Sequence, residues 1–170
     1  DPLVSIYCRL YLVVTGFEVA PHITAHLTGL INDILYSCQM LKEPHHIAKL
    51  KKWKLTAAEF SHLMSPAIEY LLRICGKICS SSPSGKELFQ TLLQAYRDYS
   101  MDLMVLVHFI EAFDGSYYAH GALGMVTLIK TASITSIKPT DAYAALAKQL
   151  VDYPPPEEQK IPLLNEIWKY

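Results

Sequence analysis

Apolar residues at the start of the chain recur three or four positions apart. This spacing places side chains on one face of an α-helix. The residues that share the face are Leu3, Ile6, Tyr7, Leu10, Val14 and Phe17. Asp1 and Pro2 suit the N-cap and the first helical position, and Gly16 and Pro21 lie where the helix would end. The pattern therefore predicts an amphipathic helix before Pro21, with this face buried.

The helical spacing continues along the chain with short interruptions. Further helices are predicted at about residues 22–41, 57–64, 66–79, 86–99, 101–113, 117–130 and 140–151, and from Pro156 onward. Thr56 and Glu59 form a capping-box pattern, Pro66 separates two of these helices, and Thr140 can cap another. Loops are expected at 80–85 and 131–139, and the polar stretch 42–54 is expected to be solvated.

Residues 101–113 differ from the other predicted helices because apolar side chains lie nearly all the way around them. Asp102, His108 and Glu111 are the exceptions. A helix of this kind is normally covered on several sides. We therefore expect an inner helix here.

The predicted helices form pairs about every 40 residues, which is typical of HEAT-like arrays. The expected fold is all-α: a HEAT-like α-solenoid of about four antiparallel helix pairs plus a terminal half-pair, in one segment covering residues 1–170. Hydrophobic residues make up 51% of the chain and charged residues only 18%, against about 25% charged in typical domains. Together with a first residue that is Asp, this apolar composition predicts a fragment of a longer solenoid.

Charge and cysteine content exclude several classes of protein. The net charge of −1 provides no basic face for nucleic acid. Polar and charged residues interrupt every apolar stretch long enough to span a membrane. The four cysteines, Cys8, Cys38, Cys75 and Cys79, fall on predicted apolar faces, so we expect small buried side chains in a reducing, cytosolic compartment.

The histidines and cysteines suggest an alternative, a helical metal-binding or enzymatic domain. His22 and His26 share a helix face, but the glutamate of a zinc hydrolase motif is missing between them. Cys75 and Cys79 have a spacing that differs from the C-x-x-C of zinc or redox sites. We favour the interpretation that the chain is not an enzyme and has no catalytic, cofactor or metal site.

Two groups of residues are candidate interaction surfaces. Lys49, Lys51, Lys52 and Lys54 surround Trp53, a combination that could anchor a protein partner or contact an anionic membrane. The alternative is a solvated loop with Trp53 folded back on the array. The aromatic pair Tyr117 and Tyr118 is the second candidate, with packing in the core as its alternative.

Three blocks of sequence carry a resemblance to a known family. They are DPLVSIYCRLYLVVTGFEVAPH at residues 1–22, SMDLM at 100–104 and PPPEEQKIPLLNEIWK at 154–169. In this order they resemble the large α-solenoid scaffold subunits of Retriever, the endosomal sorting complex related to retromer. The blocks contain no catalytic motif.

The resemblance implies a cytoplasmic scaffold, peripheral on endosomes, that takes part in recycling integral-membrane cargo. Its implied partners are an arrestin-like subunit, a catalytically silent phosphoesterase-like subunit and coiled-coil proteins, with no nucleic acid and no cofactor. It assigns none of these partners to particular residues. A membrane-surface module that uses the lysine cluster remains a further alternative.

Overall fold

The computed structural model describes residues 2–20, 25–40, 43–81, 83, 85–133 and 137–169. Within these residues the secondary structure is helical, apart from one isolated bridge between Asp102 and Ser133. The α-helices are α1 (Pro2–Val19), α2 (Ala25–Met40), α3 (Pro44–Lys52), α4 (Ala57–Ser81), α5 (Gly85–Tyr99), α6 (Leu103–Ala112), α7 (Ala122–Thr131), α8 (Pro139–Asp152) and α9 (Glu157–Trp168). The predicted all-α class is confirmed.

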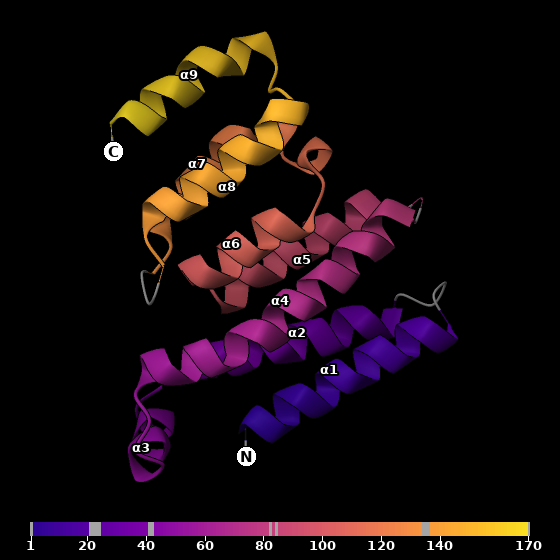
Figure 1. Ribbon diagram of the computed structural model, residues 1–170, viewed down its shortest axis with the longest axis vertical. Coiled ribbons are helices and arrows are strands. Elements are labelled where there is room, and N and C mark those ends of the chain that lie inside the picture. The colour runs from indigo at the N-terminus through magenta and orange to yellow at the C-terminus, as the bar shows by residue number, and fades with distance from the viewer. Residues whose placement is uncertain are drawn as a thin grey trace.

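The helices stack in two rows along the long axis of the molecule (Figure 1). In one row α1 packs on α4, α4 on α6, and α6 on α8. On the other side α2 packs on α5, and α7 packs on α9. The two rows are joined by contacts of α1 with α2, of α4 with α5 and of α7 with α8. The two ends of the chain lie at opposite ends of the stack, so the arrangement is solenoid-like, as predicted.

Helix α6 is the inner helix that its apolar pattern predicted. Seven of its ten residues are buried: Leu103, Met104, Val105, Leu106, Val107, Phe109 and Ile110. Asp102 caps it, because its carboxylate accepts a hydrogen bond from the Met104 amide at 2.9 Å. Helix α6 is therefore buried along most of its length.

Helix α4 corrects the prediction of two helices separated at Pro66. The capping box is present, since the Glu59 carboxylate accepts a hydrogen bond from the Thr56 amide at 2.8 Å, and the Glu59 amide donates to the Thr56 hydroxyl. The helix then continues through Pro66 to Ser81. Buried side chains on both sides of the proline, Met64 and Ala67 among them, hold it together. Tertiary packing thus outweighs the missing amide donor.

The segment 117–130 is also not a single helix. Two short 3₁₀ turns, Gly115–Tyr117 and Ala119–Gly121, precede α7. The buried Tyr118 lies between these turns, and its hydroxyl donates to the Phe109 carbonyl at 2.8 Å.

Three smaller expectations are corrected. The stretch 42–54 contains the helix α3 rather than only a solvated loop. Helix α8 begins at Pro139 with Lys138 as its N-cap, so Thr140 is not the cap. Cys8 is exposed, whereas Cys75 and Cys79 are buried as expected; the side chain of Cys38 lies outside the described residues.

Candidate interaction surfaces

The histidines and cysteines do not assemble a site in the part of the chain that the structure describes. No group of three or more potential metal ligands is found there. His22 and the side chains of His26, His45 and His46 lie outside the described residues, so the metal-binding alternative remains a prediction. Burial raises the pKa of the Cys79 thiol to about 11 and that of Cys75 further. Neither thiol is thus suited to act as a nucleophile at neutral pH.

A polar contact that the sequence did not reveal joins α4 to α6. The Ser65 hydroxyl and His108 Nε2 are 2.8 Å apart, and Glu111 Oε2 lies 4.0 Å from His108 Nδ1. Burial lowers the pKa of His108, outweighing the opposing effect of the nearby carboxylates of Glu69 and Glu111. Because 43 residues separate Ser65 from His108, no local pattern could have shown this contact. It acts as a packing contact between two helices.

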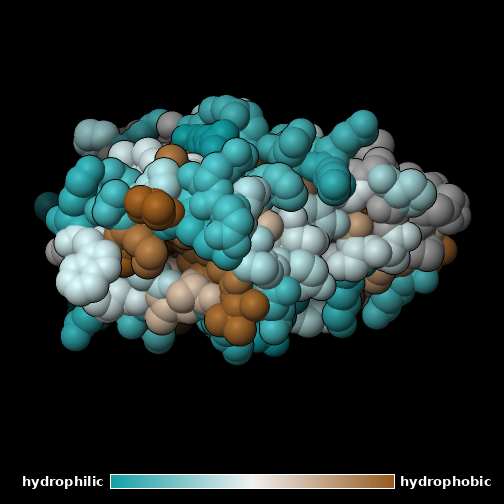
Figure 2. All heavy atoms as spheres, turned by 90° about the horizontal axis from the view of Figure 1, so that it is seen from above, coloured by the Kyte–Doolittle hydropathy of each residue, from teal (hydrophilic) through white to brown (hydrophobic). Residues whose placement is uncertain are grey.

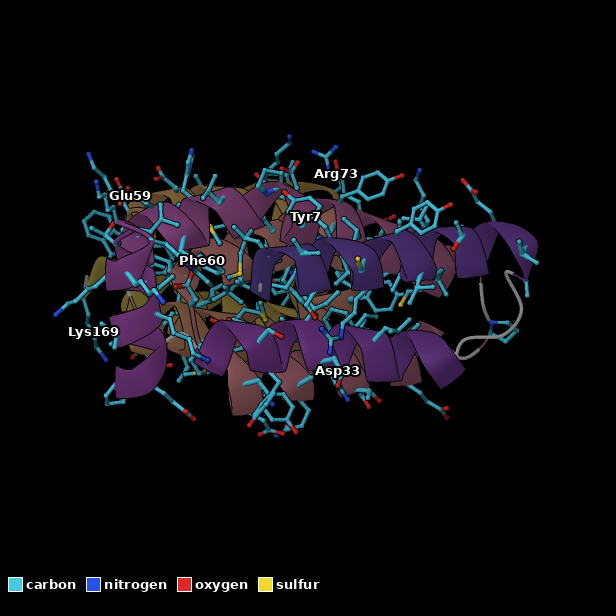
Figure 3. The ribbon with its side chains drawn as sticks, turned by 90° about the horizontal axis from the view of Figure 1, so that it is seen from below. Tyr7, Asp33, Glu59, Phe60, Arg73 and Lys169 are labelled. Atoms are coloured by element: carbon cyan, nitrogen blue, oxygen red, sulfur yellow. The ribbon has the colours of Figure 1, made fainter. Side chains whose placement is uncertain are left out.

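The lysine cluster lies on α3 and on Lys54, the residue after its C-cap Trp53. Lys49, Lys51, Lys52 and Lys54 are exposed, while Leu50, in the middle of the cluster, is buried against the body of the protein. Trp53 remains 42% exposed, so it is only partly folded back. Helix α3 contacts the stack through α4 and lies at one edge of the molecule (Figures 1 and 3).

The two residues of the aromatic pair, Tyr117 and Tyr118, differ in burial. Tyr118 is 0% exposed, so its assignment to an interaction surface is wrong. Tyr117 is partly buried, with its ring 4.9 Å from that of Phe89. Both residues belong mainly to the aromatic core formed with Phe109 and Phe113.

An apolar groove of about 700 Å³ runs along α1 beside Leu63 of α4. It is lined by Leu3, Val4, Tyr7, Cys8, Tyr11, Leu12 and Leu63. Tyr7 was expected in the buried stripe, but it is half exposed at the groove, where its hydroxyl donates to the Leu63 carbonyl at 3.3 Å. Figure 3 shows Tyr7 on the side of α1 that faces α4. The exposed apolar side of α1 was not anticipated.

A second apolar surface lies at the opposite end of the stack, on α8 and α9. Ile161, Leu164 and Trp168 of α9 are exposed, as is Val151 of α8. A cavity of about 210 Å³ between the two helices is lined by Leu146, Leu150 and Ile167, among others. Figure 2, viewed from this end, shows apolar side chains gathered between polar ones. The ion pair of Glu166 with Lys130 joins α9 to α7, and Lys169 at the end of α9 pairs with the same carboxylate.

These surfaces define the class of the protein: a helical, solenoid-like segment whose candidate sites are exposed faces. Among the helices that the structure describes, none is long and apolar enough to cross a membrane.

The comparisons with known proteins agree with the resemblance seen in the sequence. Residues 1–63 match the family model VPS35L_N, described as VPS35L. Along 99% of its length the chain is similar to proteins named VPS35 endosomal protein-sorting factor-like. Identity is 27% to the protein of Danio rerio and 24% to that of Homo sapiens, and 25% to the similarly named protein of Dictyostelium discoideum. The chain is thus similar to VPS35L-type proteins, and it spans only 17% of the length of these three.

Proposed function

We propose that this chain is a non-catalytic scaffold segment of a Retriever-type complex that recycles integral-membrane cargo from endosomes. The observation that carries the proposal is the similarity along 99% of the chain to endosomal protein-sorting factor-like proteins. A cytoplasmic protein, peripheral on endosomes, fits this similarity. Because those relatives are several times longer, the chain acts as one helical segment within a longer protein.

The distribution of buried and exposed groups supports a scaffold rather than an enzyme. The buried polar contacts of the described residues, such as Ser65 with His108 and Tyr118 with Phe109, join helices within the core. Many of the most exposed apolar side chains, among them Tyr11, Ile161 and Trp168, lie on α1 and α9, at the two ends of the stack. A stack of packed helices with contact surfaces at its ends holds its partners at a fixed separation.

The proposed partners are an arrestin-like subunit, a phosphoesterase-like subunit without catalytic activity, and coiled-coil proteins. The groove on α1 offers a surface for one of them, because exposed apolar patches of this kind mark protein interfaces. Tyr11 is its most accessible large side chain, followed by Val4 and Leu12. Their replacement leaves the core of the stack unchanged.

The experiment is affinity purification of the tagged full-length protein, followed by mass spectrometry of the proteins that co-purify. Stoichiometric arrestin-like and phosphoesterase-like subunits would support the proposal, and their absence would contradict it. Tyr11→Asp tests the α1 groove, with Tyr70→Asp as a matched control because Tyr70 is half exposed on α4 outside that groove. Loss of one subunit only with Tyr11→Asp would assign that subunit to α1.

A further inference from the structure

The strongest local charge of the molecule is concentrated on α3. Between Pro44 and Ala58 the chain contains four lysines and no acidic residue, although acidic residues outnumber basic ones in the chain as a whole. Within the described residues, none of these four lysines takes part in an ion pair. Their charges are therefore available to an external anion.

Helix geometry directs the lysines away from the body of the protein. Leu50 is 2% exposed and anchors α3. At about 100° per residue, Lys49 and Lys51 lie about 100° to either side of Leu50, and Lys52 lies nearly opposite it. The three ammonium groups thus point in different directions over the outer face of α3. Helix α3 itself projects from the stack near the start of α4 (Figure 1).

The fourth lysine is held beside the others by an unusual helix end. The Leu55 amide donates to the Leu50 carbonyl and the Lys54 amide to the Lys51 carbonyl, each at 3.0 Å. This is the Schellman arrangement, in which Lys54 occupies the left-handed position, with a φ of 57°, that glycine normally takes. A lysine here costs stability relative to glycine and adds a positive charge next to Trp53.

We propose that the outer face of α3, together with Lys54, binds the anionic headgroups of a phospholipid membrane. All four basic residues are lysines, which are depleted from protein interfaces and lack the planar guanidinium that pairs with a particular carboxylate. A cluster of mobile ammonium groups suits a diffuse layer of negative charge. Trp53 and Ile47 lie half exposed beside the buried Leu50, where they can contact the same surface.

The test is co-flotation of the full-length protein with vesicles of phosphatidylcholine alone, or of phosphatidylcholine mixed with phosphatidylserine. Binding is expected only to the mixed vesicles and should weaken with added salt. Lys51→Glu with Lys52→Glu should lower this binding by at least about 25-fold, since each lysine contributes about fivefold. Lys86→Glu with Lys148→Glu changes the net charge equally at exposed positions of α5 and α8 and should leave binding within about twofold.

Lys54→Gly separates loss of binding from loss of folding. Glycine relieves the left-handed backbone, so the thermal stability of the protein should be retained or increased. Binding to the mixed vesicles should still fall about fivefold.

Three outcomes would overturn the proposal. They are equal binding to both kinds of vesicle, wild-type binding by the Lys51→Glu and Lys52→Glu variant, and loss of a co-purifying subunit from that variant while vesicle binding is unchanged. The last outcome would assign the face to an acidic protein instead. Subunit co-purification is measured separately, so failure here leaves the proposed scaffold function intact.

Discussion

Helices α6 and α9 both contain several apolar residues, but these residues are mostly buried in α6 and mostly exposed in α9. In α6 seven of ten residues are buried, whereas in α9 only Leu163 is. Ile161 is 70% exposed and Trp168 is 85% exposed. Helix α6 has α4 on one side and α8 on the other, while α9 packs on α7. Apolar residues are buried in greater number where a helix has neighbours on both sides.

This difference separates residues that stabilise the fold from residues that are available for contacts. The same amino acid is expected to matter greatly in α6 and little in α9 when the isolated chain is unfolded. Matched substitutions in the two helices can test this directly.

The largest effect is expected from a charge placed in the middle of the stack. Val107→Asp should destabilise the chain by several kcal/mol, because Val107 is 7% exposed and the carboxylate would have no partner. Ile161→Asp in α9 should change the free energy of unfolding by less than about 0.5 kcal/mol. Chemical denaturation of both variants measures the difference. Equal losses of stability would show that the two helices are equally buried.

The next largest effect is expected from removing an aromatic side chain from the core. Phe109 is buried and stacks on Phe113 with ring centroids 4.7 Å apart, so Phe109→Ala should cost about 3–5 kcal/mol. Leu164→Ala in α9 should cost less than about 0.5 kcal/mol. Thermal unfolding followed by circular dichroism compares the two. A Phe109→Ala variant with an unchanged midpoint would contradict the described packing.

Two glycines should respond to alanine with opposite signs. A Cβ at Gly76 in α4 would lie 1.9 Å from the Ala112 carbonyl oxygen of α6, so Gly76→Ala should destabilise by about 1–3 kcal/mol. A Cβ at Gly124 in α7 meets no atom within 4 Å, and Gly124→Ala should stabilise by about 0.5–1 kcal/mol. Urea unfolding of each variant gives the sign. Stabilisation by Gly76→Ala would mean that α4 and α6 are farther apart.

The smallest effect concerns the attachment of α9 in acid. Hydrogen bonds from Lys130, and then from Lys169, lower the pKa of Glu166 to about 2, from an ordinary value of 4.5. The stabilisation from this carboxylate is therefore present above about pH 4.5 and lost as the pH falls toward 2. Glu166→Gln should flatten this part of the pH dependence, as seen in thermal midpoints measured across that range. The change should be small, because the ion pairs are exposed to solvent.

Much of the helical architecture could be predicted from local patterns. The spacing of apolar residues predicted α1, α5 and α6, and the Thr56 capping box marked the start of α4. The blocks at residues 1–22, 100–104 and 154–169 were sufficient for the family resemblance. These features depend on residues close together in the chain, so they are visible in the sequence.

The candidate surfaces were less predictable. The lysines of α3 were recognised from composition. That they surround the buried Leu50, and that Lys54 has a left-handed backbone, could be seen only in the structure. Tyr118 was taken as a surface candidate because its spacing alone cannot distinguish a buried ring from an exposed one. The contact of Ser65 with His108 spans 43 residues and leaves no local pattern.

The sequence by itself determined which segments form helices, because helix formation depends on spacing, caps and turns within a few residues. Only the tertiary structure decided that α4 continues through Pro66, that Tyr118 is buried, and that Cys8 and the outer sides of α1 and α9 remain exposed. The physical reason is that burial depends on neighbours from distant parts of the chain. Helices in the middle of the stack have such neighbours on both sides, and helices at its ends have fewer.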